Sequence, residues 1–441
     1  MPAPFLKVGQ IIKGEALDYT TYGYGHLKVD NFSLFVLNLL PGEIAEVRVI
    51  KLYKTYGFGE VVNLIQSSVN RAIPFCPIYH ICGGCDLQHL KLHEQTKFKL
   101  DLANFYLKQA GIDYEVSDIL MMENSFAYRN KVSVPFDYQG PELKFGFYKK
   151  RSNEIVDFVD CGLQSDLANQ IVFFTAKLVE KYRVKSIRHL IIREAKAYQK
   201  FMVTLVIKTT EQANLNLFRK DLIKKFPDIL SLVINYNDRK DNVILGKKSK
   251  LLYGKSYLTD ELSGLKFQIS SSAFYQINTS QTKLLYQKAI EYAKLKTDET
   301  ILDLYCGIGT IGLLASSFVK QVYGIEIVEA AVRDAKNNAE LNNIKNAEFY
   351  LGSASDVSKF ISDKIDTVFV DPPRRGLGED TCQEIVAINP NKLIYVSCNL
   401  KSLMNDLNFF IKAGYYIDEF SLVDMFPETV HVETICLMSK K

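Results

Sequence analysis

The segment TILDLYCGIGTIGLL, residues 300–314, decides the fold of this chain. Its apolar first part ends at Asp303, a glycine-rich turn runs through Gly307 and Gly309, and a helical pattern begins directly afterwards. Glycine has no Cβ, so the backbone of such a turn can approach a ligand at the N-terminus of the next helix. A strand, a glycine turn and a helix in this order predict the ligand-binding unit of an α/β sheet.

Strand-like and helical patterns alternate after this segment. The runs QVYGIEI, AEFYLGS, DTVFVDPP and KLIYVSC are apolar and are separated by helical stretches. Such regular alternation predicts a parallel, doubly wound sheet. The last two runs, EFSLVDMF and ETICLMSK, have no helix between them and predict a hairpin that closes the sheet. We assign residues 276–441 to this Rossmann-like domain.

The N-terminal half has two different patterns. Residues 1–66 contain short apolar runs divided by glycine, asparagine and proline, which predict a small OB-like β-barrel of about five strands. Residues 67–275 contain a cysteine-bearing loop, a helical pattern that Gly111 is expected to end, and mixed strands and helices. We therefore expect a multidomain α/β protein with a central mixed α+β domain.

Charge is distributed unevenly along the chain. Of the 441 residues, 47% are hydrophobic and 24% charged, a composition that excludes a mostly disordered chain. The net charge is only +4, but residues 161–295 hold 23 basic and 11 acidic residues, whereas residues 296–441 hold 14 and 21. The basic segment predicts a surface for a polyanion, with a solvated lysine-rich face as the alternative.

Membrane and export signals are not found in the sequence. No apolar run approaches the ~20 residues that a spanning helix needs, and the first ten residues, MPAPFLKVGQ, have no apolar core of a signal peptide. The eight cysteines are unevenly spaced, unlike a secreted disulfide framework. We expect a cytoplasmic, monomeric protein without membrane contact, and the sequence indicates no protein partner.

Carboxylates flank the glycine turn as a nucleoside site requires. Glu326 ends the next strand, 19 residues after Gly307, where a carboxylate can accept both hydroxyls of a ribose. Gly307, Gly309 and Gly312 also fit the pyrophosphate pattern of dinucleotide enzymes. Asp303 before the turn and Glu326 after it resemble the S-adenosylmethionine methyltransferase fold more closely than a dinucleotide enzyme.

Reactive side chains end two later strands. Asp371 opens Asp-Pro-Pro-Arg-Arg-Gly after the fourth strand, and Cys398 lies in Ser-Cys-Asn after the fifth. Open α/β sheets bind ligands outside these strand ends. Cys398 is a candidate nucleophile, although a lone cysteine is more often a small buried residue. Glu433, in His-Val-Glu-Thr, opens the last strand, and its carboxylate could remove a proton near a thiol adduct.

Half of the cysteines could form a metal site. Cys76, Cys82 and Cys85 lie in one loop, and Cys161 is distant in the sequence. Four thiolates suit a tetrahedral zinc ion as well as an iron–sulfur cluster, and spacing alone does not separate the two.

The motifs DLYCGIGT, DPPRRG, VSCN and HVET, in this order and spacing, resemble the class I S-adenosylmethionine-dependent RNA 5-methyluridine methyltransferases. Residues 1–66 resemble the TRAM barrel of that family, so the resemblance covers essentially the whole chain. It implies that Cys398 attacks C6 of uracil, that Glu433 removes the C5 proton, and that Asp371 holds the uracil edge and the methyl donor.

The resemblance also implies a set of cofactor contacts. Gln276, in Phe-Tyr-Gln-Ile-Asn, Tyr305 and Glu326 match family positions that contact S-adenosylmethionine, and Gly307 lies in the glycine turn beside them. The chain departs from the family pattern at two loop positions. Leu400 replaces a proline after Ser-Cys-Asn, and Ser402 replaces a threonine.

The cysteines indicate one branch of the family. The branch that modifies ribosomal RNA carries a [4Fe–4S] cluster on a similar four-cysteine pattern, which implies this cluster at Cys76, Cys82, Cys85 and Cys161, with zinc as the alternative. Barrel and cluster together favour 23S ribosomal RNA as the partner over transfer RNA. Some similar Gram-positive members modify two positions, so a dual-site enzyme stays open. The alternatives are a transfer-RNA 5-methyluridine methyltransferase and a non-catalytic Fe–S RNA-binding or assembly factor.

Overall fold

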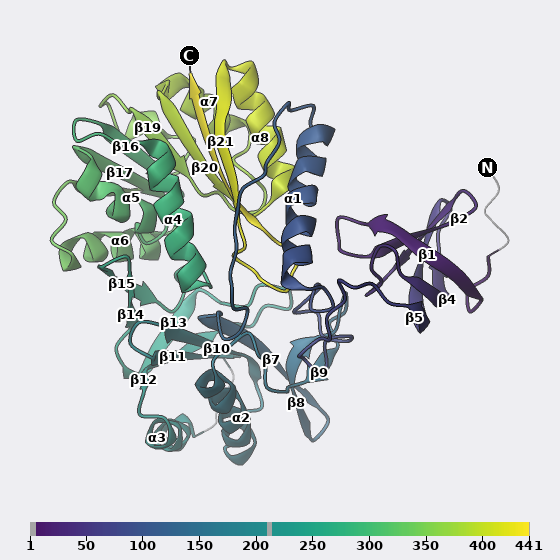
Figure 1. The fold of residues 1–441 in the computed structure, drawn as a ribbon. Helices are drawn as coiled ribbons and strands as arrows, with labels where there is room; N and C mark the ends of the chain where they lie inside the picture. The colour runs from purple at the N-terminus through teal and green to yellow at the C-terminus, as the bar shows by residue number, and fades with distance from the viewer. Residues whose placement is uncertain (1–5, 210–213, 441) are drawn as a thin grey trace.

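A computed structural model describes residues 6–209 and 214–440 of the chain (Figure 1). The first five residues of the predicted barrel domain, residue 441 of the predicted C-terminal domain and residues 210–213 lie outside the described residues. Figure 1 shows a small barrel beside helix α1, a lower sheet covered by α2 and α3, and an upper sheet with helices on both faces.

The N-terminal strands form a closed barrel in the order β1-β2-β3-β5-β4. They are β1 (Ile11–Tyr19), β2 (Gly25–Val29), β3 (Phe32–Val36), β4 (Ile44–Leu52) and β5 (Tyr56–Gln66). Residues that alternate along the strands fill the interior, among them Leu34, Val36 and Val47, which are fully buried. The predicted five-stranded barrel is confirmed.

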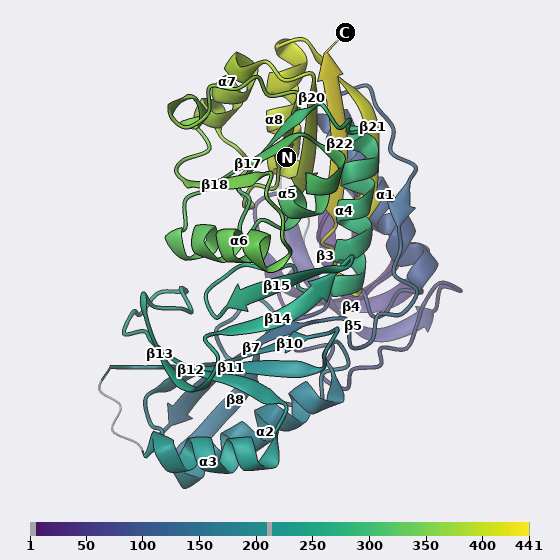
Figure 2. The same ribbon diagram turned by 90° about the vertical axis from the view of Figure 1, so that its left-hand side faces the viewer.

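The lower sheet has seven strands in the order β13-β12-β11-β10-β7-β8-β9. They are β7 (Lys131–Gln139), β8 (Glu142–Tyr148), β9 (Ile155–Asp157), β10 (Ile187–Ala195), β11 (Lys200–Ile207), β12 (Ile229–Tyr236) and β13 (Lys248–Gly254). The helices α2 (Asp166–Lys181) and α3 (Leu215–Lys225) share a hydrophobic core with it. The hairpin of β14 (Tyr257–Leu262) and β15 (Leu265–Ser270) contacts this sheet through β14 and helix α6 of the upper domain through β15 (Figure 2). The mixed α+β pattern is confirmed.

The upper sheet has eight strands in the order β18-β17-β16-β19-β20-β22-β21-β6. The parallel strands are β16 (Thr300–Leu304), β17 (Gln321–Glu326), β18 (Ala347–Leu351), β19 (Thr367–Val370) and β20 (Lys392–Ser397). The antiparallel pair is β21 (Tyr415–Val423) and β22 (Glu433–Lys440), and β22 lies between β20 and β21. The predicted doubly wound sheet and its hairpin are confirmed.

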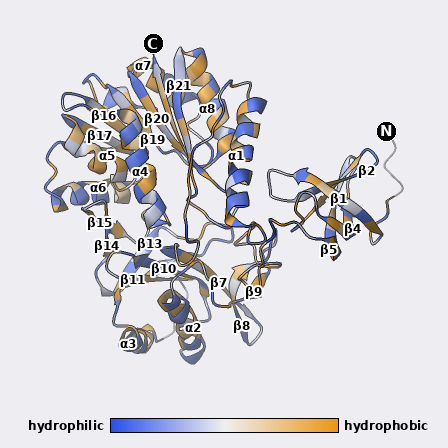
Figure 3. Cartoon of the chain, viewed as in Figure 1, coloured by the Kyte–Doolittle hydropathy of each residue, from blue (hydrophilic) through white to orange (hydrophobic). Residues whose placement is uncertain are grey.

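Two hydrophobic cores cover the two faces of the upper sheet. One core includes α4 (Thr279–Ala293), α5 (Thr310–Ala315) and α6 (Glu329–Leu341), and the other includes α7 (Glu379–Ile388), α8 (Leu400–Lys412) and α1 (Leu92–Gln109). Figure 3 shows hydrophobic strands inside this sheet and helices that carry hydrophilic residues on part of their surface.

The predicted central domain, residues 67–275, includes α1, but the structure packs this helix against the upper sheet. Ala103 and Leu107 of α1 are fully buried in the core of the upper sheet, and the following β6 (Ile119–Leu120) extends that sheet beside β21. The helix ends as predicted, because Gly111 takes a φ of +69° directly after it. Within residues 6–209 and 214–440, no helix is long and apolar enough to cross a membrane.

Candidate active site

The glycine turn after β16 opens one side of the site. The backbone at Gly309 has a φ of +81°, and a Cβ there would lie 2.9 Å from the Phe349 ring. A Cβ at Gly307 would meet nothing within 4 Å, so this residue borders open space. The Gly312 N–H donates to the Asp303 carboxylate at 2.9 Å, so the third glycine of the pyrophosphate pattern serves an internal contact. The other Asp303 oxygen has no hydrogen-bond partner among the described residues, although it is buried.

A cavity of about 230 Å³ adjoins this turn and includes Tyr305 and Glu326 in its wall. The Glu326 carboxylate accepts hydrogen bonds from the N–H groups of Gly307 (3.1 Å) and Val328 (2.9 Å), which fix its orientation. An oriented carboxylate, an unpartnered buried aspartate oxygen and an open glycine fit the ribose and amino-acid parts of a nucleoside cofactor. The opposite wall was not predicted; it consists of the residues around Ser353 and the segment 377–381.

Four predicted site residues, three at strand ends and Gln276 in the loop before α4, come together. The Gln276 amide donates to the Asp371 carboxylate at 3.4 Å. Ser397, which precedes Cys398, pairs with Thr434, which follows Glu433, in the antiparallel ladder of β20 and β22. The thiol of Cys398 and the carboxyl of Glu433 therefore lie at one edge of the sheet, beside Asp371.

Burial dominates the electrostatics of these groups. It raises the pKa of the Asp371 carboxyl to about 7. Burial, and then the neighbouring Asp371, raise the pKa of Glu433 well above its usual range. Burial, and then Glu433 and Asp371, raise the pKa of the Cys398 thiol to about 11, whereas Arg374 opposes the shifts of Cys398 and Glu433. One Glu433 oxygen has no hydrogen-bond partner within the described residues, so it is available to a ligand.

Arg374 was not assigned a role from the sequence, although it lies in the quoted DPPRRG motif. Its carbonyl accepts hydrogen bonds from the Asn399 amide (2.7 Å) and the Ser402 hydroxyl (3.1 Å), which join the Asp371 loop to the Cys398 loop. Ser402 replaces the expected threonine but keeps this hydroxyl contact. Gly376 is required in the same loop, because its φ is +81° and a Cβ would lie 2.5 Å from the Asp406 carboxylate.

Cys398 lines a second cavity, which has a volume of about 310 Å³. The loop between β1 and β2 contributes Tyr22, helix α1 contributes Tyr106, and the segment 430–432 forms a further wall. The side chain of Tyr22 is 64% exposed there. No local pattern predicts this wall, because its parts come from three distant segments.

Comparison with known proteins agrees with this geometry. The sequence model of the family tRNA (Uracil-5-)-methyltransferase matches residues 240–441, and the TRAM domain model matches residues 13–62. An uncharacterized RNA methyltransferase of Clostridium tetani is 39% identical over 95% of this chain and 94% of its own length, and one of Listeria innocua is 38% identical over the full length of both. The chain belongs to the RNA (uracil-C5) methyltransferase family.

A solved structure extends the similarity to the whole fold. The tRNA (uracil-54, C5)-methyltransferase of Pyrococcus abyssi, in complex with S-adenosyl-L-homocysteine, superimposes with a TM-score of 0.78 and 28% identity. It covers 97% of this chain and 99% of its own. The present protein is thus an S-adenosylmethionine-dependent RNA (uracil-C5) methyltransferase with an N-terminal TRAM barrel.

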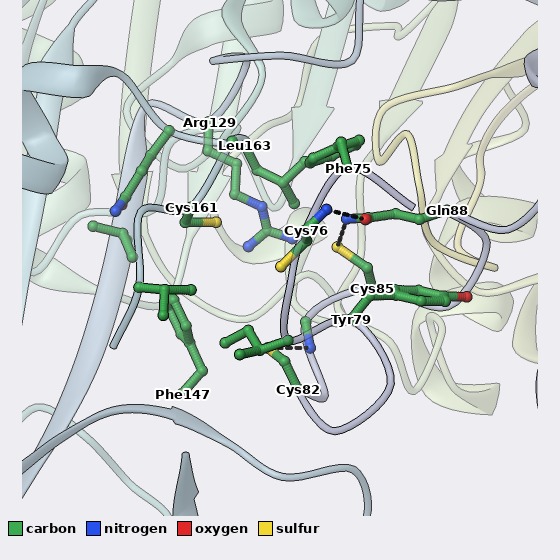
Figure 4. Close-up of a pocket in the computed structure, with 16 residues that line it drawn as sticks. Phe75, Cys76, Tyr79, Cys82, Cys85, Gln88, Arg129, Phe147, Cys161 and Leu163 are labelled. Carbon is green, nitrogen blue, oxygen red and sulfur yellow. Dashed lines mark hydrogen bonds between the residues drawn. The ribbon is translucent and has the colours of Figure 1, made fainter. Parts of the chain in front are cut away.

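The methyltransferase has a separate group of thiols, which Figure 4 shows, with three on the loop before α1 and one between β9 and α2. Cys76, Cys82, Cys85 and Cys161 line one cavity of about 80 Å³ together with Arg129. Figure 4 shows these side chains on different sides of the cavity, and in the described part of the chain no group of three or more His, Cys, Asp or Glu is close enough to hold a single metal ion.

The hydrogen-bond donors and the positive charge around these thiols fit an iron–sulfur cluster. The Gln88 amide donates to Cys85 Sγ at 3.2 Å and the Gly84 N–H to Cys82 Sγ at 3.4 Å. Burial raises the pKa of the Cys82 and Cys85 thiols, that of Cys85 to about 12. A bound metal would hold these sulfurs as thiolates, and the nearby guanidinium of Arg129 would balance the negative charge.

Proposed function

We propose that this enzyme methylates C5 of uridine in 23S ribosomal RNA, with Cys398 as the nucleophile and Glu433 as the base. The observation that carries the catalytic part is the meeting of Cys398, Glu433 and Asp371 at one edge of the upper sheet, between the cofactor-side cavity and the cavity around the thiol. An enzyme that methylated an exocyclic amine would need neither the thiol nor the second carboxyl.

The chemistry explains why a thiol is required. C5 of uracil is a weak nucleophile, and addition of the Cys398 thiolate to C6 gives an enolate with carbanion character at C5. Bound S-adenosylmethionine supplies an electrophilic methyl group, which C5 takes up. Glu433 then accepts the C5 proton, the electrons of that C–H bond restore the C5–C6 double bond, and the C6–S bond breaks to release the thiolate.

The other predicted residues would position the reactants. Asp371 would hold the polar edge of the uracil and the methyl donor, and Gln276, which donates a hydrogen bond to Asp371, would contact the donor. Arg374 is the cation that favours the charged forms of Cys398 and Glu433. Tyr305, Gly307 and Glu326 would bind the cofactor in the adjoining cavity. A uridine in folded RNA would have to leave its stack to reach this site, at a cost of a few kcal/mol.

The four-cysteine site supports ribosomal RNA as the substrate, through the resemblance of its pattern to that branch of the family. We propose a [4Fe–4S] cluster there, since four separate thiols around a cavity suit a multi-atom cluster better than one zinc ion. The barrel itself does not discriminate, because a transfer-RNA enzyme matches 97% of this chain. Transfer RNA is therefore the second candidate.

Mapping 5-methyluridine in cells that lack this protein tests the proposal. We expect the modification to disappear from 23S ribosomal RNA and to return with the wild-type gene but not with Cys398→Ala. The number of positions lost shows whether the enzyme has one target or two. Loss from transfer RNA alone would overturn the substrate assignment, and loss from neither RNA would favour a non-catalytic factor.

A further inference from the structure

The segment 424–432 determines where the proposed base lies. It connects β21 to β22, and Glu433 is the first residue of β22. Val430, His431 and Val432 line the cavity around Cys398. A shift of this segment would therefore move both the base and one wall of the pocket.

Glu428 lies at the centre of this segment in an unfavourable backbone conformation. Its φ is +67°, in the left-handed region that favours glycine, and only 6% of the residue is exposed. A non-glycine residue keeps such a conformation only where its surroundings enforce it. The contacts of Glu428 show what enforces it here.

The cysteine loop holds the backbone of Glu428. The Glu428 carbonyl accepts hydrogen bonds from the N–H groups of Asp86 (2.8 Å) and Leu87 (3.0 Å), the two residues that follow Cys85. The Asp86 carboxylate accepts in turn from the Val430 N–H at 3.4 Å. The loop that carries three of the four clustered thiols thus pairs directly with the segment before Glu433.

Helix α1 holds the same segment from the other side. Gln95 accepts from the Glu428 N–H at 3.1 Å and donates to the Glu428 carboxylate at 3.0 Å. Lys99 is fully buried, forms an ion pair with Asp424 and donates to the Phe426 carbonyl at 3.2 Å. The carboxylate of Glu428 is therefore hydrogen-bonded by Gln95 and Ser125, and its backbone carbonyl by the cysteine loop.

We propose that Glu428 is a positioning residue that couples the order of the cysteine loop to the placement of Glu433. The inference rests on the proposed function, in which Glu433 removes the C5 proton. It gives the cysteine site a task in catalysis. A loop ordered by its three thiols together with Cys161 fixes Asp86 and Leu87, these fix Glu428, and Glu428 fixes the base.

Substrates with 5-fluorouridine separate this role from general destabilisation. Addition of Cys398 to C6 and methyl uptake at C5 proceed with fluorine at C5, but no proton is there to remove, so the covalent adduct accumulates without a base. The rate of adduct formation with 5-fluorouridine RNA thus depends on the reactivity of the thiol and on the binding of the cofactor and the RNA, but not on the base. Turnover of uridine RNA reports the base as well.

Glu428→Ala removes the carboxylate contacts with Gln95 and Ser125 and keeps the backbone hydrogen bonds of residue 428. We expect it to slow uridine turnover by about 10- to 100-fold, the cost of misplacing a catalytic group by ~1 Å, while the rate of 5-fluorouridine adduct formation stays near that of the wild type. With uridine RNA the variant should accumulate a denaturation-resistant adduct. Glu428→Gln keeps an oxygen that can accept from Gln95 and should restore turnover.

A buried glutamate in the barrel is the matched control. Glu43 is fully buried and accepts hydrogen bonds from the backbone N–H groups of Leu40 and Ser68, both at 2.9 Å. Glu43→Ala should lower stability without accumulation of a uridine adduct. A proportional loss of both rates in Glu428→Ala, or no loss of turnover, would overturn the proposal. Turnover by Cys398→Ala would instead overturn the proposed function.

Hydrogen exchange tests the link to the cysteine loop in the purified full-length protein. In Cys85→Ser, or in Cys82→Ser if the first variant is insoluble, the amides of residues 428–433 should exchange faster while those of α4 stay unchanged. Cys436→Ser, which alters a buried cysteine of β22 outside the cluster site, should leave residues 428–431 protected. Unchanged exchange at residues 428–433 in both cluster-site variants would contradict the coupling.

Discussion

The cysteine site and the Cys398 centre both consist of partly or fully buried thiols, yet their neighbours assign them opposite tasks. Burial raises the pKa of Cys85 and of Cys398 alike. Around Cys85 the partners are three other thiols, amide donors and a guanidinium, which together suit permanent ligation. Around Cys398 they are two carboxyls and one arginine, beside a cavity open to a ligand, which suit a bond that forms and breaks. The surroundings of a buried thiol, more than its burial, determine its chemistry.

The largest effect expected from this comparison is in Cys398→Ala. Methyl transfer to RNA should fall below detection, because no other thiol can add to C6, while S-adenosylmethionine still binds. Transfer of a labelled methyl group and titration calorimetry measure the two properties. Cys382→Ala, which alters a buried packing cysteine, is the control and should retain activity. Turnover in Cys398→Ala would show that Cys398 is not the nucleophile and would contradict the different tasks of the Cys398 centre and the cysteine site.

The next effect is expected in Glu433→Gln. The amide cannot accept the C5 proton, so turnover should fall by about 10²- to 10⁴-fold while the thiol still adds to C6. Denaturing gels should then show a protein–RNA adduct with ordinary uridine. A variant that loses turnover without any such adduct would assign Glu433 to another step.

The pH profile sharpens the contrast between catalytic and ligating thiols. The Cys398 pKa is raised to about 11, so the thiolate fraction grows with pH across the neutral range, and the raised pKa of Glu433 adds to the same trend. The single-turnover rate should rise between pH 6 and 9, by up to about tenfold per unit for one controlling group. A rate that is flat or falls over this range would contradict the assignment.

Replacement of one of the four proposed cluster cysteines should change the colour and the stability of the protein. The purified wild type is expected to be brown with broad visible absorption, whereas zinc has a filled d shell and gives none. Cys161→Ser should lose that absorption and melt at a lower temperature. A colourless wild type that contains one zinc per chain would replace the cluster by zinc.

The smallest effect is a gain in stability. The Asp371 pKa of about 7 exceeds the unfolded value of about 3.9, so between these pH values the folded state keeps a proton that the unfolded state loses. The contribution of Asp371 to stability therefore falls as pH rises. Asp371→Asn should raise the melting temperature at pH 8 by several °C and leave it nearly unchanged at pH 4, where the Asp371 carboxyl of the folded state is protonated. An equal change at both pH values would show that ionisation is not the cause.

Much of the fold could be predicted from local sequence patterns. The glycine turn at Gly307, the alternating runs of the upper sheet and the close breakers of the barrel each depend on neighbouring residues, and each predicted element formed. The placement of α1 did not follow, because an amphipathic helix shows that one face is buried but not which core buries it. The same holds for Tyr22, whose place beside Cys398 depends on how the barrel packs.

The candidate site could likewise be predicted only in part from the sequence. The carboxyl ends of the parallel strands β19 and β20 bring Asp371 and Cys398 to one edge, and the start of the antiparallel strand β22 brings Glu433 to the same edge. Arg374 was overlooked because an arginine in a proline-rich loop has no pattern that reveals its neighbours. Glu428 was overlooked for a similar reason, since a strained φ has no signature in a glutamate.

The most direct test of the account is to locate the covalent bond. The enzyme is incubated with S-adenosylmethionine and RNA that contains 5-fluorouridine, digested with protease and nuclease, and analysed by mass spectrometry. The account predicts one modified peptide, with a methylated fluorouridine attached to Cys398, and no adduct on Cys76, Cys82, Cys85 or Cys161. An adduct on one of those four cysteines, or turnover of uridine RNA without any trapped adduct, would contradict it.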